Sequence, residues 1–472
     1  MTDDLRPAAT GRLKLSTILT FSLATIPTSA LGIALGIYLP RYFAGHLGVG
    51  LGVVGAAFFA VRMIDIPVDP VLGVLMDRTR TRIGRYRVWF LTGAPILMLA
   101  VYQLFMAKPG IGEVYIVGWL LVLYLGTSIL GLSQGAWSAT LAPEYNERTR
   151  LFGITSMVSI VATVAVLAIP IIPTHLSEAA DVQAMGWVAI LLAPLCVGIV
   201  AWRVPEKVSA DVETHRFPLS DYLAIARKPE ILRLFFAQAC LTLGPGWMSA
   251  LYLFFFGDVL HFSFAQSSGL LILYILAGVA GAPATAWVSS RLNKHRTLIA
   301  ATTAYSIGLC TIFVLPRGQF FVTAPVMLWC GFMASGFGLL TSSMTADVGD
   351  EVRLEQGRQR MSLIYSVTGL AAKIAGAFAF AFSFGLLAAV GYQAKEGAHN
   401  TQAAIQWLEY IYILGPIFFV MVGGACFVGW KLDATRHGEI RAALDARDAA
   451  LGEAALLEGL TGQAVAAPAP GE

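Results

Sequence analysis

The sequence VGLGVVGAAFFAVRMIDIPVDPVLGVLM, residues 49–76, is apolar throughout except for Arg62, Asp65 and Asp69. A helix needs about 20 apolar residues to cross the ~30 Å hydrocarbon core of a bilayer, so this stretch is long enough to span a membrane. The strands of a membrane β-barrel would alternate apolar and polar side chains over about ten residues, which this stretch does not do. It therefore predicts a membrane-spanning α-helix.

Eleven further apolar runs of this kind occupy the rest of the chain. The twelve runs begin near residues 16, 49, 86, 114, 151, 185, 232, 265, 298, 321, 361 and 407. Only 13% of the 472 residues are charged, whereas soluble domains carry roughly 25%. The polar N-terminus leads directly into the first run, without the short apolar segment and cleavage site of a signal peptide. We therefore predict an all-α integral membrane protein with twelve transmembrane helices.

Lysine and arginine residues indicate the orientation of the helices, because cytoplasmic loops are enriched in both. With the N-terminus inside, 26 of the 32 Lys and Arg residues are cytoplasmic. Four fall outside, at Arg41, Lys108, Arg317 and Lys395. We expect a multi-pass protein of the cell inner membrane with both termini in the cytoplasm. The net charge of +3 gives no reason to expect a nucleic-acid partner.

The longest internal polar segment divides the twelve helices into six and six. It predicts a six-helix half over 1–203, a cytoplasmic connection over 204–231, a second six-helix half over 232–432 and a cytoplasmic tail over 433–472. Transporters with two similar halves place the solute site between them, near the middle of the membrane. In the tail we expect a short polar helix over 437–457 and disorder in the last residues.

Four charged residues lie within the predicted spans: Arg62, Asp65, Asp69 and Lys373. Each would cost at least about 2.5–3.5 kcal/mol at the bilayer centre, so together they would cost on the order of 10 kcal/mol if unpaired. Because this rivals the stability of a whole protein, the four must face a polar cavity and balance one another. For Arg62, a purely structural role in joining two helices remains open beside a role at the site.

The two carboxylates carry the stronger functional signal. Asp65 and Asp69 lie one turn apart on one helical face, where like charges repel each other. A cation that prefers oxygen ligands, or a bound proton, would relieve this repulsion. We predict that the pair binds the coupling ion, H⁺ or Na⁺, and that Lys373 competes for the carboxylates when the ion leaves. Beyond a possible Na⁺ at this pair, we expect no metal and no cofactor.

The sequence around the carboxylates resembles a known group of transporters. Residues 73–78, GVLMDR, with Gly-Arg at 84–85, match the loop signature of the major facilitator superfamily. The longer string DIPVDPVLGVLMDRTRTRIGRYRVW, residues 65–89, is similar to the glycoside–pentoside–hexuronide:cation symporters, the melibiose permease group. Further agreement is found in 141–151 (LAPEYNERTRL), 346–350 (ADVGD), Tyr365 and Lys373. The resemblance runs from the first helix to the twelfth. It implies the major facilitator fold and alternating access by rocking of the two halves.

The resemblance also implies roles for particular residues. Asp65 and Asp69 would be the cation-site carboxylates, with Lys373 close to them. Charged residues at the cytoplasmic ends of helices are expected to hold those ends together as a conformational latch, unless they are simply basic cytoplasmic loops. The latch residues are Asp77, Arg78, Arg85, Glu144, Arg148, Asp347 and Asp350.

The chain departs from the melibiose permease pattern at several positions. That permease has an Asn one residue before the second carboxylate, where this chain has Val68. The loss of this oxygen favours a proton over Na⁺. Its sugar-site residues are also missing: Ser29 and Ser156 stand where the permease has an Asp and an Arg, and no Asp or Glu occurs from 114 to 143. The substrate therefore stays open between a glycoside, an oligosaccharide and a solute that is not a sugar.

Polar and aromatic residues of the central helices are the candidates for solute binding. They are Gln134, Trp137, Trp247, Tyr365 and Ser29. An aromatic ring can stack on a sugar face or an apolar tail, and each ring can equally serve packing. Trp247 follows Gly244-Pro245-Gly246, where we expect the helix to break.

The leading prediction is a secondary active transporter that couples H⁺ or a cation to symport of a glycoside-like or oligosaccharide solute. A cation-coupled symporter of an amphiphile such as a lysolipid is the alternative, because the sugar-site acids are absent. A transporter-like sensor would need a long signalling domain, and the tail has only about 40 residues. An enzyme is not expected, since the sequence has no Ser-His-Asp arrangement, metal cluster or phosphate loop. We expect a monomer in the lipid bilayer with a small-molecule solute as its partner.

Overall fold

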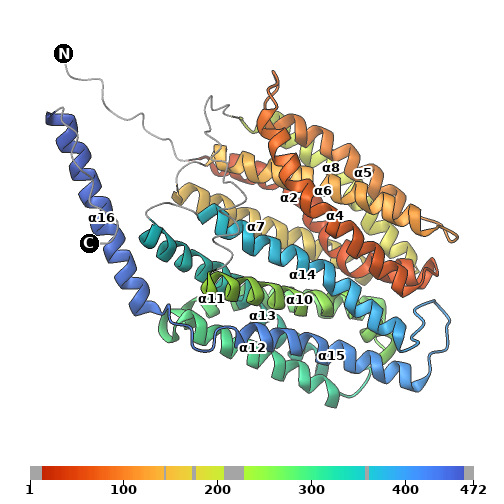
Figure 1. Cartoon of the computed structure of the whole chain (residues 1–472). Helices are drawn as coiled ribbons and strands as arrows, with labels where there is room; N and C mark the ends of the chain where they lie inside the picture. Colours follow the sequence, from red (N-terminus) through yellow and green to blue (C-terminus); the bar gives the residue numbers. More distant parts are fainter. Residues whose placement is uncertain (1–12, 143–144, 173–176, 207–227, 357–360, 462–472) are drawn as a thin grey trace. The chain divides into compact units, whose positions relative to one another are not determined.

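The computed structural model of the chain describes residues 13–142, 145–172, 177–206, 228–356 and 361–461 (Figure 1). Within these residues all regular structure is helical. Twelve segments are long and apolar enough to cross a membrane: Leu15–His46, Leu51–Arg78, Tyr86–Phe105, Glu113–Leu141, Glu147–Ile171, Glu178–Arg203, Pro229–Val259, Phe264–Leu292, Lys294–Val314, Phe320–Glu355, Leu363–Ala389 and Gln402–Ala425. Each coincides with one of the twelve apolar runs, so the predicted all-α fold with twelve transmembrane helices is confirmed.

The first span is a composite of short helices, and the other spans are mainly single helices. The first span consists of α1 (Leu15–Ser22), α2 (Thr25–Ile33), η1 (Ala34–Tyr38), α3 (Leu39–Arg41) and η2 (Tyr42–His46). The next five contain α4 (Leu51–Arg78), α5 (Tyr86–Phe105), α6 (Glu113–Leu141), α7 (Tyr145–Leu167) with η3 (Ile169–Ile171), and α8 (Glu178–Arg203). The remaining elements are α10 (Pro229–Phe254), η4 (Phe255–Val259), α11 (Phe264–Leu292), α12 (Lys294–Thr311), η5 (Ile312–Val314), α13 (Phe320–Gln356), α14 (Met361–Ala389), α15 (Gln402–Ala425) and α16 (Ala434–Thr461).

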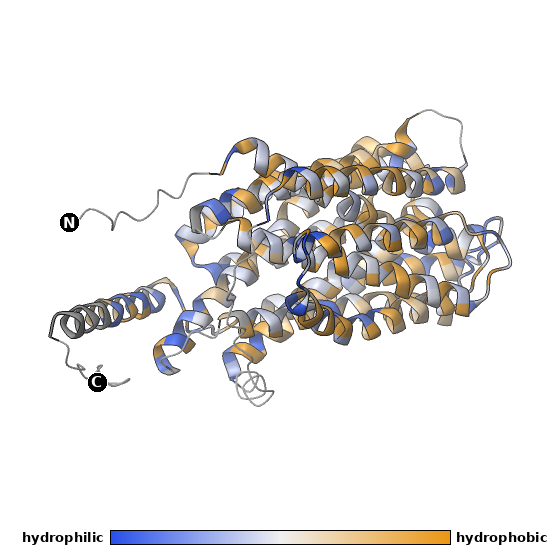
Figure 2. Ribbon diagram, turned by 90° about the horizontal axis from the view of Figure 1, so that it is seen from above, coloured by the Kyte–Doolittle hydropathy of each residue, from blue (hydrophilic) through white to orange (hydrophobic). Residues whose placement is uncertain are grey.

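Apolar residues cover the membrane-spanning helices, whereas α16 carries many hydrophilic residues (Figure 2). Large apolar side chains such as Val161, Phe321 and Phe418 are exposed on these helices. Lipid is the solvent on such surfaces, so the exposure is what membrane-spanning helices require. The polar helix predicted over 437–457 is present as α16, and it extends further at both ends.

The chain forms two compact units, each assembled from separate stretches of sequence. The first contains the described residues of Met1–Thr214 together with Ser249–Ile272 and Phe380–Glu409. The second contains the described residues of His215–Met248, Leu273–Ala379 and Tyr410–Glu472. The linear division into halves at 204–231 stays a prediction.

Close helix contacts build the first unit. In it α5 packs against α6 and α8, α4 packs against α6, and α2 packs against α7. Gly126 permits the approach of α6 to α5, because a Cβ there would lie 3.0 Å from the backbone of Leu97. Small residues serve this purpose in membrane helices, where close backbone packing drives association.

The first span and α10 end in the same way. Each closes with a π turn, η2 and η4. Leu47 N–H donates to Tyr42 O at 3.1 Å, and Leu260 N–H donates to Phe255 O at 3.2 Å. Both of these ends belong to the first unit.

The expected break at Pro245 is wrong. α10 runs without interruption from Pro229 to Phe254 and contains Pro245 in its interior. A proline removes one backbone hydrogen bond but need not end a membrane helix, because neighbouring helices and side chains satisfy the freed groups.

Candidate functional site

The first carboxylate of the predicted ion site is buried within the first unit. Asp65 lies in the interior of α4, with 5% of its surface exposed. Ser128 Oγ of α6 donates a hydrogen bond to Asp65 Oδ1 at an oxygen–oxygen distance of 3.0 Å. This hydrogen bond joins the carboxyl group of α4 to α6.

Arg62 takes part in the same contact between α4 and α6. Its guanidinium lies over the ring of Tyr124, 4.5 Å from the centroid. A desolvated cation over an aromatic face is stabilised by about 2 kcal/mol. Tyr124 and Ser128 are one turn apart on α6, so a single face of this helix meets both Arg62 and Asp65.

The second carboxylate and the lysine are both half-buried in the interiors of helices. Asp69 follows Asp65 by one turn on α4. Lys373 lies in α14 and belongs to the second unit. Its proximity to the carboxylates stays a prediction, as do the coupling roles of all four charged residues.

Val68 has apolar surroundings. Its side chain packs against a buried cluster of α4 and α6 that contains Leu72, Met76 and Ile129. The position where melibiose permease carries an amide oxygen is therefore part of a hydrophobic contact here. Ser128 instead brings a neutral oxygen to Asp65, which the sequence reasoning missed. Its spacing of four residues from Tyr124 was the available signal.

A pocket of about 240 Å³ lies among α1, α2, α6 and α7 of the first unit. It is lined by Phe21, Thr25, Gly131, Gln134, Gly135, Ser138, Leu151, Phe152 and Thr155. Gln134 Nε2 donates to Thr25 Oγ1 at 2.6 Å, which joins two walls of the pocket. These nine lining residues are all described, and none is charged, so the pocket suits an uncharged group of a solute.

Among the five solute candidates, Gln134 lines this pocket. Ser29 lies one turn after Thr25 on α2, with its Oγ 2.6 Å from Ser159 Oγ of α7. Trp137 is fully buried, and its ring packs edge-on against Phe21, with centroids 5.9 Å apart.

Trp247 and Tyr365 belong to the second unit. Trp247 Nε1 donates to Ile411 O at 3.0 Å, which ties α10 to α15. The Tyr365 hydroxyl donates to Ser342 O at 3.0 Å, and 41% of this residue is exposed. Roles in solute binding for all five candidates stay predictions.

The loop between α4 and α5 contains Arg85, whose latch role stays a prediction. This loop is held by a glutamate that the sequence pattern does not predict. Glu206 Oε1 accepts hydrogen bonds from the backbone N–H groups of Arg85 at 2.6 Å and Tyr86 at 2.7 Å. Glu206 Oε2 accepts a third from Arg87 N–H at 3.2 Å. A carboxylate at the start of α5 satisfies free N–H groups and complements the helix dipole. The loop is thereby docked to the chain just after α8.

Three further predicted latch residues of the N-terminal half lie near the ends of α4 and α7. Asp77, Arg78 and Arg148 are exposed, and Glu144 lies outside the described residues. Next to Arg148, Glu147 Oε2 accepts from Leu13 N–H at 3.2 Å, and Arg150 Nη1 donates to Leu13 O at 3.1 Å. These neighbours hold the start of the first span to α7.

Asp347 and Asp350 lie near the end of α13 in a cluster of charges. Lys294 Nζ of α12 is 2.6 Å from Asp347 Oδ2. From α16, His437 Nε2 is 3.1 Å from Asp350 Oδ2, and Arg441 Nη1 is 3.7 Å from Asp350 Oδ1. The two aspartates thus connect α13 to α12 and to the tail helix.

A second charged cluster gathers around Arg41, at the opposite end of the first span from Leu15. Arg41 Nη1 lies 3.4 Å from Asp258 Oδ2 of η4, and Arg41 Nε lies 4.0 Å from Glu178 Oε2 of α8. The Tyr392 hydroxyl also donates to Asp258. Burial, and then the neighbouring Asp258 carboxylate, raise the pKa of Tyr392, so its phenol stays protonated as the donor. The sequence pattern predicts only that Arg41 lies outside the membrane, and it does not predict these partners.

Comparison with known proteins places the chain among transporters. Residues 20–434 match the family described as MFS/sugar transport protein. The isoprimeverose transporter of Lactiplantibacillus pentosus is 23% identical over 412 residues, covering 84% of each chain. The glucuronide carrier protein homolog of Escherichia coli (strain K12) is 22% identical over 449 residues, covering 92% of this chain and 96% of the relative.

Solved structures agree on the fold. A proton-dependent oligopeptide transporter superposes with a TM-score of 0.66 at 13% identity, covering 90% of this chain and 99% of that chain. The nucleoside transporter NupG superposes with a TM-score of 0.63 at 12% identity, covering 88% of this chain and 99% of that chain. Together with the match to the MFS/sugar transport protein family, these structures confirm the predicted major facilitator fold.

Proposed function

We propose that this chain, which belongs to the MFS/sugar transport protein family, is a proton-coupled symporter. Its solutes are glycoside-like molecules or oligosaccharides. It is a multi-pass membrane transporter of that family, and the relatives named after isoprimeverose and lactose support a sugar-like solute. We further propose that it lies in the cell inner membrane as a monomer. The distribution of Lys and Arg supports a cytoplasmic position for both termini.

The observation that carries the proposal is the buried Asp65 carboxylate on a membrane-spanning helix, with Asp69 one turn further. Two such groups in low dielectric favour uptake of a positive charge between them. A proton needs no further oxygen ligands, whereas Na⁺ would need several, and Val68 contributes none. A bound proton would remove one negative charge from the pair and so change which conformations of the carrier are favoured.

The Arg41 cluster serves in this proposal as a gate on the outer side. It joins the end of the first span to α8, η4 and the segment that holds Tyr392. In alternating access these contacts have to separate whenever the outer side opens. Partly buried charges with several partners suit a gate. Their hydrogen bonds are all formed when the outer side is closed and are replaced by water when it opens.

The proposal is tested by solute accumulation in proteoliposomes with Asp65→Asn and Asp69→Asn. Isoprimeverose and lactose serve as probes, and an inward proton gradient supplies the driving force. We expect each variant to lose uphill accumulation while it remains folded in detergent. The control is Glu113→Gln, which changes an exposed carboxylate at the start of α6 and should leave accumulation unchanged. Full accumulation by either aspartate variant would refute the coupling role.

A further inference from the structure

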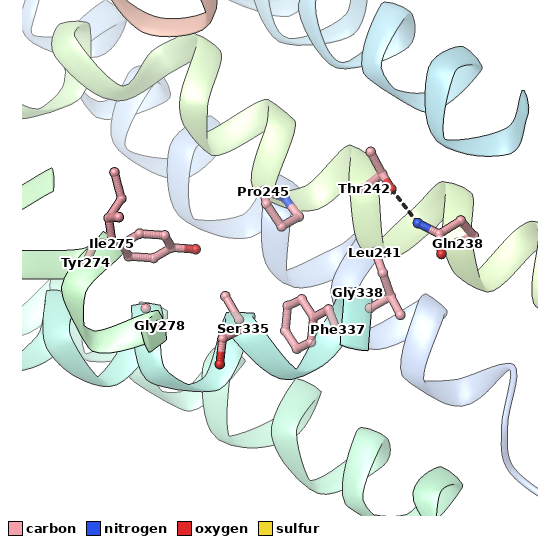
Figure 3. Close-up of a pocket in the computed structure, with 12 residues that line it drawn as sticks. Gln238, Leu241, Thr242, Pro245, Tyr274, Ile275, Gly278, Ser335, Phe337 and Gly338 are labelled. Carbon is pink, nitrogen blue, oxygen red and sulfur yellow. Dashed lines mark hydrogen bonds between the residues drawn. The ribbon is translucent and has the colours of Figure 1, made fainter. Parts of the chain in front are cut away.

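A second cavity lies within the second unit, among α10, α11 and α13 (Figure 3). Its volume is about 350 Å³, which falls within the range of about 300–1,000 Å³ that proteins use for small ligands. It is lined by Gln238, Leu241, Thr242, Pro245, Tyr274, Ile275, Gly278, Gly331, Ala334, Ser335, Phe337 and Gly338.

Two glycines give this cavity its shape. Gly331 of α13 lies against the backbone of Tyr274 on α11, since a Cβ there would come 2.8 Å from the Tyr274 Cα. Gly278 of α11 faces the same helix, with Ser335 and the Gly331 carbonyl nearest to it. The two helices therefore meet closely, and Tyr274, Ser335 and Phe337 are among the residues that line the space beside them (Figure 3).

The cavity presents hydrogen-bonding groups in a fixed arrangement. Gln238 Nε2 donates to Thr242 Oγ1 at 3.1 Å, one turn along α10 (Figure 3). The Thr242 hydroxyl can then donate to a ligand, and the Gln238 amide oxygen can accept from one. Ser335 donates to Phe332 O at 2.8 Å and keeps its oxygen lone pairs as acceptors. Pro245 also lines this wall and has no N–H, so it cannot donate to the carbonyl of Leu241 one turn before it.

Charge is missing from this surface. All twelve lining residues belong to the described part of the chain, and none is Asp, Glu, Lys, Arg or His. An ionised carboxylate placed here would lose its hydration without gaining a counter-charge, which is strongly unfavourable. A ring that bears hydroxyl groups meets no such penalty, because the amide and hydroxyl groups can replace its water.

We propose that this cavity binds an uncharged ring of the transported glycoside. Thr242, Gln238 and Ser335 hydrogen-bond its hydroxyl groups, and the rings of Tyr274 and Phe337 lie against its apolar face. This inference rests on the proposed function and narrows it, because it assigns neutral glycosides rather than hexuronides as substrates.

The test uses two probes that differ in charge, 4-nitrophenyl-β-D-glucoside and 4-nitrophenyl-β-D-glucuronide, with the purified full-length protein. We expect calorimetric binding of the glucoside and binding of the glucuronide at least ten-fold weaker. Thr242→Val keeps the side-chain shape and removes the hydroxyl, so it should weaken glucoside binding about five- to ten-fold, as should Gln238→Met. Thr311→Val is the control, because Thr311 lies at the exposed end of α12 and should bind as wild type.

The outcomes separate this inference from the proposed function. Equal binding of both probes, or unchanged glucoside binding in Thr242→Val and Gln238→Met, would overturn the cavity assignment while leaving glycoside transport intact. Failure of the wild type to bind or transport any sugar would refute the proposed function and the inference together. Ser335→Trp should fill the cavity and abolish glucoside binding. If the Ser335→Trp protein does not fold, glucoside binding by Thr242→Val and Gln238→Met tests the cavity assignment.

Discussion

At the scale of single residues, Gly84 shows how one position can serve both the backbone and a partner. Its φ of 126° lies in a region that residues with a Cβ rarely adopt. A Cβ there would also come 2.8 Å from the carboxyl carbon of Glu206. The Gly-Arg pair at 84–85 of the loop signature thus has a local physical reason. The glycine lets the glutamate reach the N-terminus of α5, and the backbone of Arg85 supplies one of the N–H donors.

The first prediction concerns this docking. Glu206→Ala should destabilise the protein by about 1–2 kcal/mol, because three backbone N–H groups lose their acceptor. The stability of Glu206→Gln should lie between those of Glu206→Ala and the wild type, since its amide oxygen can still accept a hydrogen bond. Thermal unfolding in detergent measures the effect, with Glu113→Ala as the matched exposed carboxylate. Equal melting temperatures for Glu206→Ala and the wild type would show that the cap contributes nothing.

At the scale of elements, the π turns η2 and η4 explain why Arg41 and Asp258 can meet. Each turn widens the last turn of its helix. Arg41 directly precedes η2, and Asp258 lies within η4. Phe254, the last residue of α10, also lies under the guanidinium, with its centroid 5.0 Å away. An ion pair with an aromatic neighbour is therefore built from matching ends of two helices.

The second prediction tests this ion pair by exchanging its charges. Arg41→Asp and Asp258→Arg should each lower the melting temperature and slow uptake, because each leaves a partly buried charge beside a like charge. The double variant should recover part of the loss, with a coupling energy of about 0.5–3 kcal/mol. Lys108→Asp, at an exposed site on the predicted outer side, is the control. If the effect of the double variant equalled the sum of the two single effects, the Arg41–Asp258 ion pair on which the gate depends would be contradicted.

The third prediction concerns the docking of α16 to α13. Arg353 Nη2 lies 2.8 Å from Asp448 Oδ2, in addition to the pairs that Asp350 makes with the tail. These groups are partly exposed, and salt screens exposed charges, with a Debye length of about 10 Å at 0.1 M and 3 Å at 1 M. Hydrogen exchange over 434–450 should therefore accelerate on going from 0.1 to 1 M NaCl, and Arg353→Gln should accelerate it already at 0.1 M. If neither 1 M NaCl nor Arg353→Gln changed the exchange rate, apolar packing alone would hold α16 to α13.

At the scale of the whole molecule, the sequence was sufficient for the number and positions of the spans. Twelve apolar runs leave a helix as the stable form in lipid, since backbone groups must be satisfied within each segment. The run containing Asp65 also identified the carboxylate that is buried in α4. The tail helix followed from its composition, although its contacts with Asp350 did not.

Contacts between distant segments could not be read from the sequence. Ser128 beside Asp65, Glu206 at the start of α5 and Asp258 beside Arg41 are each separated from their partners by more than 60 positions in the chain. Periodicity identifies a helix and its faces but not which faces meet. The same limit explains the wrong prediction at Pro245. The sequence rule that proline breaks a helix is local, whereas neighbouring helices in the bundle allow α10 to continue.

The most direct test of the central claim is the movement of protons with the solute in proteoliposomes that hold a trapped pH indicator. Addition of isoprimeverose or lactose outside should acidify the lumen of vesicles with wild-type protein, without any requirement for Na⁺. Asp65→Asn should bind the same sugar yet produce no acidification. Sugar uptake that needs Na⁺ at constant pH and membrane potential, or unchanged proton movement in Asp65→Asn, would contradict proton coupling at the buried carboxylate.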